Sequence, residues 1–184
     1  MSRREKLRSA TSSQHAALDR IVAEQKNFTD LDGYVRWLRA MYRFHRDMEQ
    51  EVDGWCAHPL IPCDPLRRRT ALLSQDLSDL KSPVPTQEPR PLSPSTWAEA
   101  LGMLYVTEGA SLGARLLFVQ AKKLGLSEMF GARQLGFAAS NLESWRQLLQ
   151  LLEDFDGAPE DEVKMIHSAQ RTFLAASEHL SRQA

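Results

Sequence analysis

The sequence lacks any apolar run that approaches the ~20 residues needed to cross a bilayer. It is also poor in cysteine, with only Cys56 and Cys63 among 184 residues. Two cysteines at this spacing form neither a disulfide framework nor a redox pair, so they indicate a reducing setting. The charged segment 1–15 has no apolar segment after it, which argues against a secretory signal. These absences predict a cytoplasmic protein with no membrane association.

An excess of charge of either sign is missing as well. The chain has 23 basic residues (Lys and Arg) and 24 acidic residues (Asp and Glu), for a formal net charge of −1. Domains dedicated to nucleic acids are usually basic, so no nucleic-acid partner is expected. The sequence has no GxGxxG, Walker loop, nucleophile elbow, HExxH or EF-hand loop. Cys56, His58 and Cys63 could in principle bind zinc, but they lack the standard ligand spacing.

The pattern that is present is helical. Apolar residues recur at three-and-four spacing along the chain, and no strand-like alternation interrupts them. We expect about six helices, over roughly 3–23, 31–55, 65–80, 97–123 and 141–155 and from Pro159 onward. Ser95 is the expected cap of the fourth helix and Ser140 of the fifth. With 42% hydrophobic residues, the chain is expected to form one all-α domain over 1–184.

The helix expected over 97–123 contains two glycines near its middle. Gly109 and Gly113 lie one turn apart, among Ala110, Ser111 and Ala114. Each glycine costs a helix about 1 kcal/mol relative to alanine. Two explanations are open: tight packing against another helix, or close approach of a ligand to the backbone. Taken by itself, this helix favours the packing explanation.

A histidine lies on a partly apolar face of the first expected helix. His15 shares this face with Arg8, Thr11 and Leu18 by helical spacing. It could be a core histidine with a local hydrogen bond, or an axial ligand of a metal or haem iron. Asp19, one turn later, could accept a hydrogen bond from the second ring nitrogen and so orient the ligand.

Together these two segments resemble the haem oxygenases, particularly their compact bacterial, biliverdin-producing branch. LYVTEGASLGARLL is similar to the distal-helix pattern Tyr-Val-x-Glu-Gly-Ser-x-Leu-Gly-Gly/Ala, and QHAALD to the proximal element His-x-x-Leu-Asp/Glu. The segments WRQLLQLL and AQRTFLAASEHL look like the same branch, so the resemblance covers most of the chain. It implies a single-domain helical bundle in which haem is sandwiched between a proximal helix and a kinked distal helix.

The resemblance also implies roles for the matching residues near the iron. His15 corresponds to the iron ligand, and Asp19 to the acidic residue that orients it. Gly109 and Gly113 correspond to the glycines whose backbone packs directly over the haem, with Ser111 between them in the same catalytic segment.

Further residues correspond to positions around the haem edge. Arg8 and Tyr105 match residues that contact the haem propionates and thereby set which meso carbon is attacked. Phe173 matches an aromatic residue that lines the edge of the haem. Ala110 stands at a haem-contacting position where many bacterial members have serine, so a hydroxyl that helps to position distal water is absent. Ala114 replaces a second common glycine.

The implied activity is that of a haem oxygenase, an oxidoreductase. Such an enzyme binds haem b (iron protoporphyrin IX) as both cofactor and substrate, and opens it to biliverdin, CO and ferrous iron. The reaction uses O₂ and electrons from an external donor of ferredoxin or flavin-reductase type. Arg3, Arg4, Lys6 and Arg8 are the expected docking patch for this donor.

The sequence leaves open the biological role of the enzyme and two functions other than catalysis. A bilin-accepting phytochrome is an implied partner, but iron acquisition is an equally suitable role. The same scaffold could serve as a non-catalytic carrier of haem or bilin. A protein that keeps only the fold for interaction would need neither His15 nor the two glycines.

Overall fold

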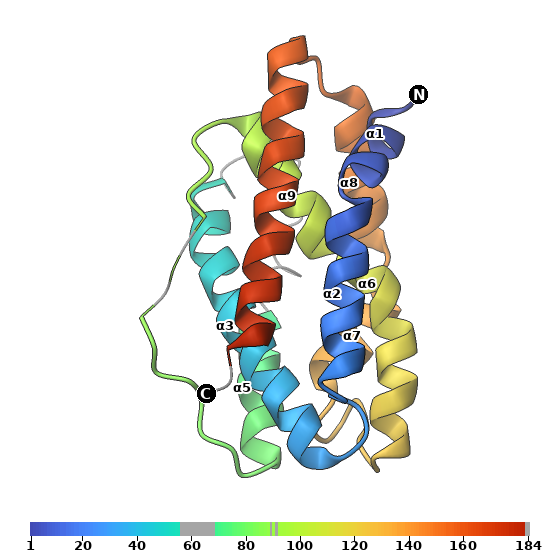
Figure 1. Ribbon diagram of the computed structural model, residues 1–184, viewed down its shortest axis with the longest axis vertical. Helices are drawn as coiled ribbons and strands as arrows, with labels where there is room; N and C mark the ends of the chain where they lie inside the picture. Colours follow the sequence, from blue (N-terminus) through green and yellow to red (C-terminus); the bar gives the residue numbers. More distant parts are fainter. Residues whose placement is uncertain (56–68, 89, 91, 183–184) are drawn as a thin grey trace.

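The computed structural model describes residues 1–55, 69–88, 90 and 92–182, with the backbone alone for 51–54. These residues form eight α-helices and no β-sheet (Figure 1). The helices are α1 (Arg3–Ala10), α2 (Ser12–Glu24), α3 (Leu31–Trp55), α5 (Arg69–Asp79), α6 (Trp97–Lys123), α7 (Arg133–Ser140), α8 (Glu143–Asp154) and α9 (Pro159–Ser181). The expected all-α class is confirmed. The zinc combination of Cys56, His58 and Cys63 lies outside the described residues.

The segment 3–23 forms two helices, where the sequence predicts one. The break falls at Thr11, whose backbone has φ −109° and ψ 4°. The Thr11 hydroxyl donates to the Leu7 carbonyl (2.8 Å), and the Thr11 carbonyl accepts from the His15 N–H (3.0 Å). Arg8 and His15 therefore lie on different helices, α1 and α2.

The caps of two later helices also differ from the prediction. Thr96, not Ser95, caps α6: its hydroxyl accepts a hydrogen bond from the Glu99 N–H (3.3 Å). The hydroxyl of Ser140 donates back to the carbonyls of Gly136 and Phe137, both at 3.0 Å. Ser140 thus ends α7, a helix of eight residues that is not among the six expected from the sequence, and α8 begins at Glu143.

The long helix α6 contributes to both apolar core clusters. Leu101 and Leu104 belong to the cluster shared with α8 and α9, and Ala114 and Ala121 belong to the cluster shared with α3, α5 and α7. The helix is uninterrupted over 27 residues, although its path changes direction part-way along in Figure 1. Its buried surface therefore fixes α6 against the rest of the bundle along most of its length.

Helix α9 supports both α2 and α6. The three helices run in the same direction (Figure 1), and α2 and α6 each pack against α9. The Gln170 side chain donates to the Ala10 carbonyl at the end of α1, just before α2 (2.8 Å), and Ser168 Oγ donates to the Glu99 carbonyl of α6 (2.7 Å). Among the described residues, α2 and α6 make at most marginal contact with each other. The two helices are therefore held by their common support on α9, and we call the interval between them the groove between α2 and α6.

Candidate functional site

His15 and Asp19 form a pair on the exposed face of α2. His15 Nδ1 lies 3.0 Å from Asp19 Oδ2, and the two side chains are 61% and 70% exposed. Because the carboxylate holds Nδ1, Nε2 is the ring nitrogen left for a metal. His15 is thus not a core histidine, and the local acceptor expected for an iron ligand is in place.

Phe173 on α9 supports the His15 ring from the side. The two ring centroids lie 5.6 Å apart in an edge-to-face arrangement, and Phe173 is buried. Such a contact restricts the rotation of the imidazole. The pair formed by His15 and Phe173 therefore joins the exposed face of α2 to the core.

The register of α2 against α6 follows from a contact at the top of the groove. The Tyr105 phenol is hydrogen-bonded to the Thr11 side chain. The two helices run in the same direction (Figure 1), so residues one turn further along each remain level. His15 follows Thr11 by four residues, and Gly109 follows Tyr105 by four. His15 and Gly109 therefore each lie one helical turn beyond this contact, on α2 and α6.

Gly109 and Gly113 of α6 are not required by packing between helices. A Cβ added at Gly113 would have no atom within 4 Å, and one at Gly109 would make only an ordinary contact with Trp145 Cζ3 at 3.5 Å. At Gly102, by contrast, an added Cβ would lie 2.1 Å from the Met165 carbonyl oxygen. Gly102 is the glycine that lets α6 approach α9. Gly109 and Gly113 leave free space over the α6 backbone.

Two leucines extend the glycine face toward the end of α6. Leu112 and Leu116 lie within about 60° of Gly109 around the helix axis. They are 51% and 74% exposed, although the sequence places them in the apolar stripe of this helix. Exposed leucines beside two glycines form an apolar surface suited to a flat, apolar ligand. The sequence did not predict that these two leucines would be exposed.

Ser111 and Ala110 do not share that face. Ser111 is two residues from each glycine, which puts it about 200° around the helix, and it is 2% exposed. Ala110 is exposed but points about 100° away from Gly109. Gly109 and Gly113 therefore share one face of α6, and Ser111 lies inside the protein.

Tyr105 and Arg8 lie at one end of the groove. Burial raises the pKa of the Tyr105 phenol, while the charges of Arg4 and Arg8 and the hydrogen bond with Thr11 oppose that shift. The exposed Arg8 thus acts electrostatically on Tyr105 from α1. Trp145 of α8 lies beside Tyr105 with ring centroids 5.6 Å apart, and it also faces Gly109. Trp145 is a buried residue whose ring packs beside Gly109, a contact that the leucine-rich pattern of α8 did not predict.

A buried ion pair fixes α6 immediately before the glycines. Arg69 Nη2 lies 2.7 Å from Glu108 Oε1, and the two side chains are almost fully buried. Arg69 also donates to the Thr107 carbonyl. Burial raises the pKa of Glu108, and the charge of Arg69 opposes the shift. The pair joins the start of α5 to the middle of α6, which is where a rigid backbone would matter for a ligand lying on Gly109.

Comparison with known proteins decides the family. The family model described as "Heme oxygenase" matches residues 2–181. The chain belongs to the haem oxygenase family. Heme oxygenase PigA of Pseudomonas aeruginosa is 32% identical over 183 residues, covering 98% of this chain and 92% of that protein. A heme oxygenase of Xanthomonas campestris pv. campestris is 30% identical over 124 residues, covering 67% of this chain and 74% of that protein.

A solved structure supports the fold. The NO- and CO-bound heme oxygenase of Neisseria meningitidis superposes with a TM-score of 0.83 at 24% identity, covering 100% of this chain and 94% of that one. The predictions of a haem-oxygenase-like bundle and of a haem-degrading oxidoreductase are therefore confirmed. Among the described residues, no helix is long and apolar enough to span a bilayer. The roles of individual residues stay predictions.

Proposed function

We propose that the groove between α2 and α6 binds haem b as substrate, with His15 as the iron ligand and the glycine face of α6 lying over the opposite side of the ring. The observation that carries this proposal is the contact of Tyr105 with Thr11, one turn before Gly109 on α6 and one turn before His15 on α2. The free space at Gly113 and the ordinary contact at Gly109 fit a flat ring, because added Cβ atoms would occupy its place. The exposed Leu112 and Leu116 would gain an apolar partner.

Each residue of the groove has a task that follows from its position. Asp19 holds His15 Nδ1, which would leave Nε2 free to bind the iron. Phe173 limits rotation of the imidazole. When bound, haem supplies the iron that activates O₂ and the meso carbon that is oxidised, on the way to biliverdin, CO and ferrous iron. Gly109 and Gly113 would let the α6 backbone approach the ring, because neither carries a side chain on that face.

The end of the groove at Arg8 and Tyr105 suits the haem propionates. A carboxylate there would meet the positive charge of Arg8 and the phenol O–H of Tyr105. These contacts would fix the rotation of the haem, and with it the meso carbon that faces α6. Ala110 offers no hydroxyl toward the groove, so ordered water would be positioned by the α6 backbone instead.

The proposed electron donor is a protein of ferredoxin or flavin-reductase type. Of the basic residues expected to dock it, Lys6 forms an ion pair with Glu162 (2.9 Å), and Arg3 donates to the Leu152 carbonyl. Arg4 and Arg8 remain exposed beside the groove. We therefore place the docking patch on these two arginines. We also propose, from the sequence alone, that a phytochrome accepts the bilin product. A cytoplasmic location is likewise a proposal from the sequence.

The experiment that tests this function distinguishes haem degradation from haem binding without turnover. Purified protein is loaded with haem, the absorption spectrum is checked for histidine ligation, and a reductant is supplied under air with catalase present. We expect the Soret band to disappear as a bilin band and ferrous iron appear in equal amounts. A haem spectrum that survives several cycles of reduction in air would instead establish the non-catalytic carrier.

A further inference from the structure

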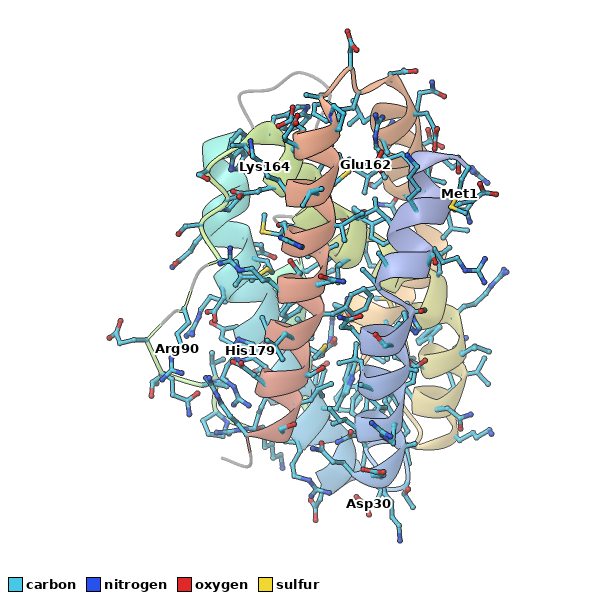
Figure 2. The ribbon with its side chains drawn as sticks, turned by 45° about the horizontal axis from the view of Figure 1, so that its top comes forward. Met1, Asp30, Arg90, Glu162, Lys164 and His179 are labelled. Atoms are coloured by element: carbon cyan, nitrogen blue, oxygen red, sulfur yellow. The ribbon has the colours of Figure 1, made fainter. Side chains whose placement is uncertain are left out.

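A cavity of about 710 Å³ lies between α5, α6 and α7. Its volume is within the range that is typical of small-molecule sites. In Figure 2 the later half of α6 (yellow) runs along one edge of the molecule, toward the end marked by Asp30 and away from the end marked by Glu162. None of the residues that line the cavity is among those assigned to the groove between α2 and α6.

The apolar part of the lining comes from all three helices. Leu72 belongs to α5, Phe118 and Val119 belong to α6, and Phe137 belongs to α7. Leu72, Phe118 and Phe137 are each only partly buried, and Phe118 packs against the core cluster shared by α3, α5, α6 and α7. Two partly exposed phenylalanines in one cavity form a surface suited to a flat, conjugated ligand.

Two basic residues of the lining have no carboxylate partner. Arg115 and Lys122 both line the cavity and are exposed. Neither forms an ion pair within the part of the chain that the structure describes. Lys122 Nζ lies 4.3 Å from the centroid of the Phe118 ring, so one of the two positive charges is held over an apolar residue of the cavity. These two residues are therefore available to bind a negatively charged ligand.

The other charged residues of the lining are Arg133 and Glu128. Arg133 is already paired with Asp76 and Asp79, so its charge is compensated within the protein. Glu128 is exposed and, among the described residues, has no ion-pair partner. The cavity therefore offers two unpaired cations and one unpaired carboxylate. This combination favours a ligand that has two negative charges and also N–H donors.

An exposed apolar stripe joins the glycine face of α6 to this cavity. Val119 lines the cavity and follows Leu112 by seven residues and Leu116 by three, so the three side chains lie on one side of the helix. Val119 is 51% exposed, and both leucines are more than half exposed. By the rise of the helix, Val119 lies about 9 Å beyond Gly113. A ligand that leaves the glycine face would thus reach the cavity along an apolar surface.

We propose that this cavity binds a linear tetrapyrrole, the bilin product of haem degradation, after it leaves the groove between α2 and α6. The choice of ligand rests on the proposed function of that groove. Arg115 and Lys122 would bind the two propionate carboxylates of the bilin. Its flat body would lie against Phe118 and Phe137, and its pyrrole N–H groups would donate to Glu128. Haem, whose nitrogens bind the iron, and a fatty acid both lack such donors.

The test uses protein loaded with ferric haem, so that the groove is occupied, and biliverdin as the probe. No reductant is present, so the haem is not degraded, and binding is followed by the circular dichroism that the bilin acquires in a chiral site. We expect one saturable bilin site per chain and an unchanged haem spectrum. Arg115→Gln and Lys122→Gln alter exposed residues and should fold normally, and each should weaken biliverdin binding by about tenfold. Val119→Glu should weaken it further, because it adds a negative charge and removes an apolar contact.

Lys123→Gln is the matched control, because Lys123 is an exposed neighbour of Lys122 that donates to Gln120 and does not line the cavity. It should bind biliverdin as the unaltered protein does. The proposal would be overturned by equal weakening in Lys122→Gln and Lys123→Gln, or by the absence of saturable binding to the haem-loaded protein. Displacement of haem by biliverdin, or tighter binding of laurate than of biliverdin, would also overturn it.

Failure of this site can be told apart from failure of the proposed groove. Loss of bilin binding in Arg115→Gln with an unchanged haem spectrum concerns this cavity alone. A chain that takes up no histidine-ligated haem would instead contradict the groove. In that case the titration of haem-free Arg115→Gln and Lys123→Gln with biliverdin decides the cavity by itself, because neither residue belongs to the groove.

Discussion

Asp19 Oδ2 lies 3.0 Å from His15 Nδ1, one helical turn further along α2, and both side chains are more than half exposed. An exposed pair of this kind adds little to stability, because solvent screens the charges. The pair instead orients the His15 ring, because it occupies Nδ1 and leaves Nε2 as the free ring nitrogen. Changes at these two residues should therefore affect haem ligation and leave the free energy of unfolding nearly unchanged.

His15→Ala should abolish the histidine-ligated haem spectrum, and added imidazole should restore it in part. Asp19→Asn should keep the ligand but weaken its donor strength, which shifts the absorption of the ferrous CO complex. Visible spectroscopy of the haem-loaded variants measures both effects. His167→Ala, at an exposed histidine of α9, is the control and should match the unaltered protein. An unaltered haem spectrum in His15→Ala would show that His15 is not the iron ligand.

Gly113 and Gly102 should respond in opposite ways to a larger side chain. Gly113→Ala meets no atom within 4 Å, so we expect the haem-free protein to gain up to about 1 kcal/mol from the better helix former. Gly113→Leu should also fold but should lose haem affinity and turnover. Gly102→Ala would place a methyl group 2.1 Å from the Met165 carbonyl, so it should destabilise the haem-free fold.

Urea unfolding of the haem-free variants, followed by haem titration, separates these two outcomes. A Gly113→Leu variant with normal turnover would contradict the proposal that the α6 backbone lies over the ring. A Gly102→Ala variant as stable as the unaltered protein would show that α6 can shift along α9, and would weaken the contrast between the two glycines.

Periodicity was sufficient to predict most helices, but not where polar groups end them. The bounds of α3 and the start of α9 at Pro159 agree with the prediction, because each begins beside a strong local signal. The break at Thr11 depends on a hydroxyl that turns back to Leu7. The start of α7 depends on Asp76, which accepts hydrogen bonds from the backbone N–H groups of Arg133 (2.8 Å) and Gln134 (3.0 Å). Contacts between residues so far apart in the chain leave no periodic signal.

In the candidate site, too, local motifs were predictable from the sequence, and features that depend on neighbouring helices were not. The pairing of His15 with Asp19 and the shared face of Gly109 and Gly113 were predictable, because each lies in a short motif on a single helix. The exposed Leu112 and Leu116 were not, because an apolar residue on a helix reads as core until the neighbouring helix is placed. Ser111 was included because it lies between the glycines in sequence, although 200° of rotation, by about 100° per residue, puts it on the buried side.

Tyr105→Phe and Arg8→Gln should change which biliverdin isomer is formed. Each removes one polar group from the end of the groove proposed to hold the propionates, and the haem could then bind in a second rotation. We expect turnover to persist with a mixture of isomers, and a larger change in the double variant. Chromatography of the extracted bilins measures the ratio. Arg20→Gln, an exposed arginine on α2, is the control, and an unchanged ratio in the double variant would place the propionates elsewhere.

Asp47 should contribute a pH-dependent part of the stability. Burial alone would raise the pKa of this carboxyl, but hydrogen bonds from His179, from the Arg90 backbone and from Arg46, together with the charge of His179, bring it below its usual value. The folded state therefore holds the carboxylate more strongly than the unfolded chain, whose Asp has a pKa of about 3.9. This stability is fully present above that value and is lost as the pH falls through the folded-state pKa.

The comparison that isolates this effect is Asp47→Asn against the unaltered protein, by urea unfolding from pH 7 down to pH 3. At pH 7 we expect the variant to be less stable by about 1–3 kcal/mol, because His179 and Arg46 lose a charged acceptor. The difference should shrink below about pH 4, where the carboxyl begins to protonate. Asp154→Asn, at an exposed residue that accepts from Gln150, should show a much smaller difference throughout. A difference for Asp47→Asn that stayed constant to pH 3 would mean that packing, rather than the charge, makes Asp47 stabilising.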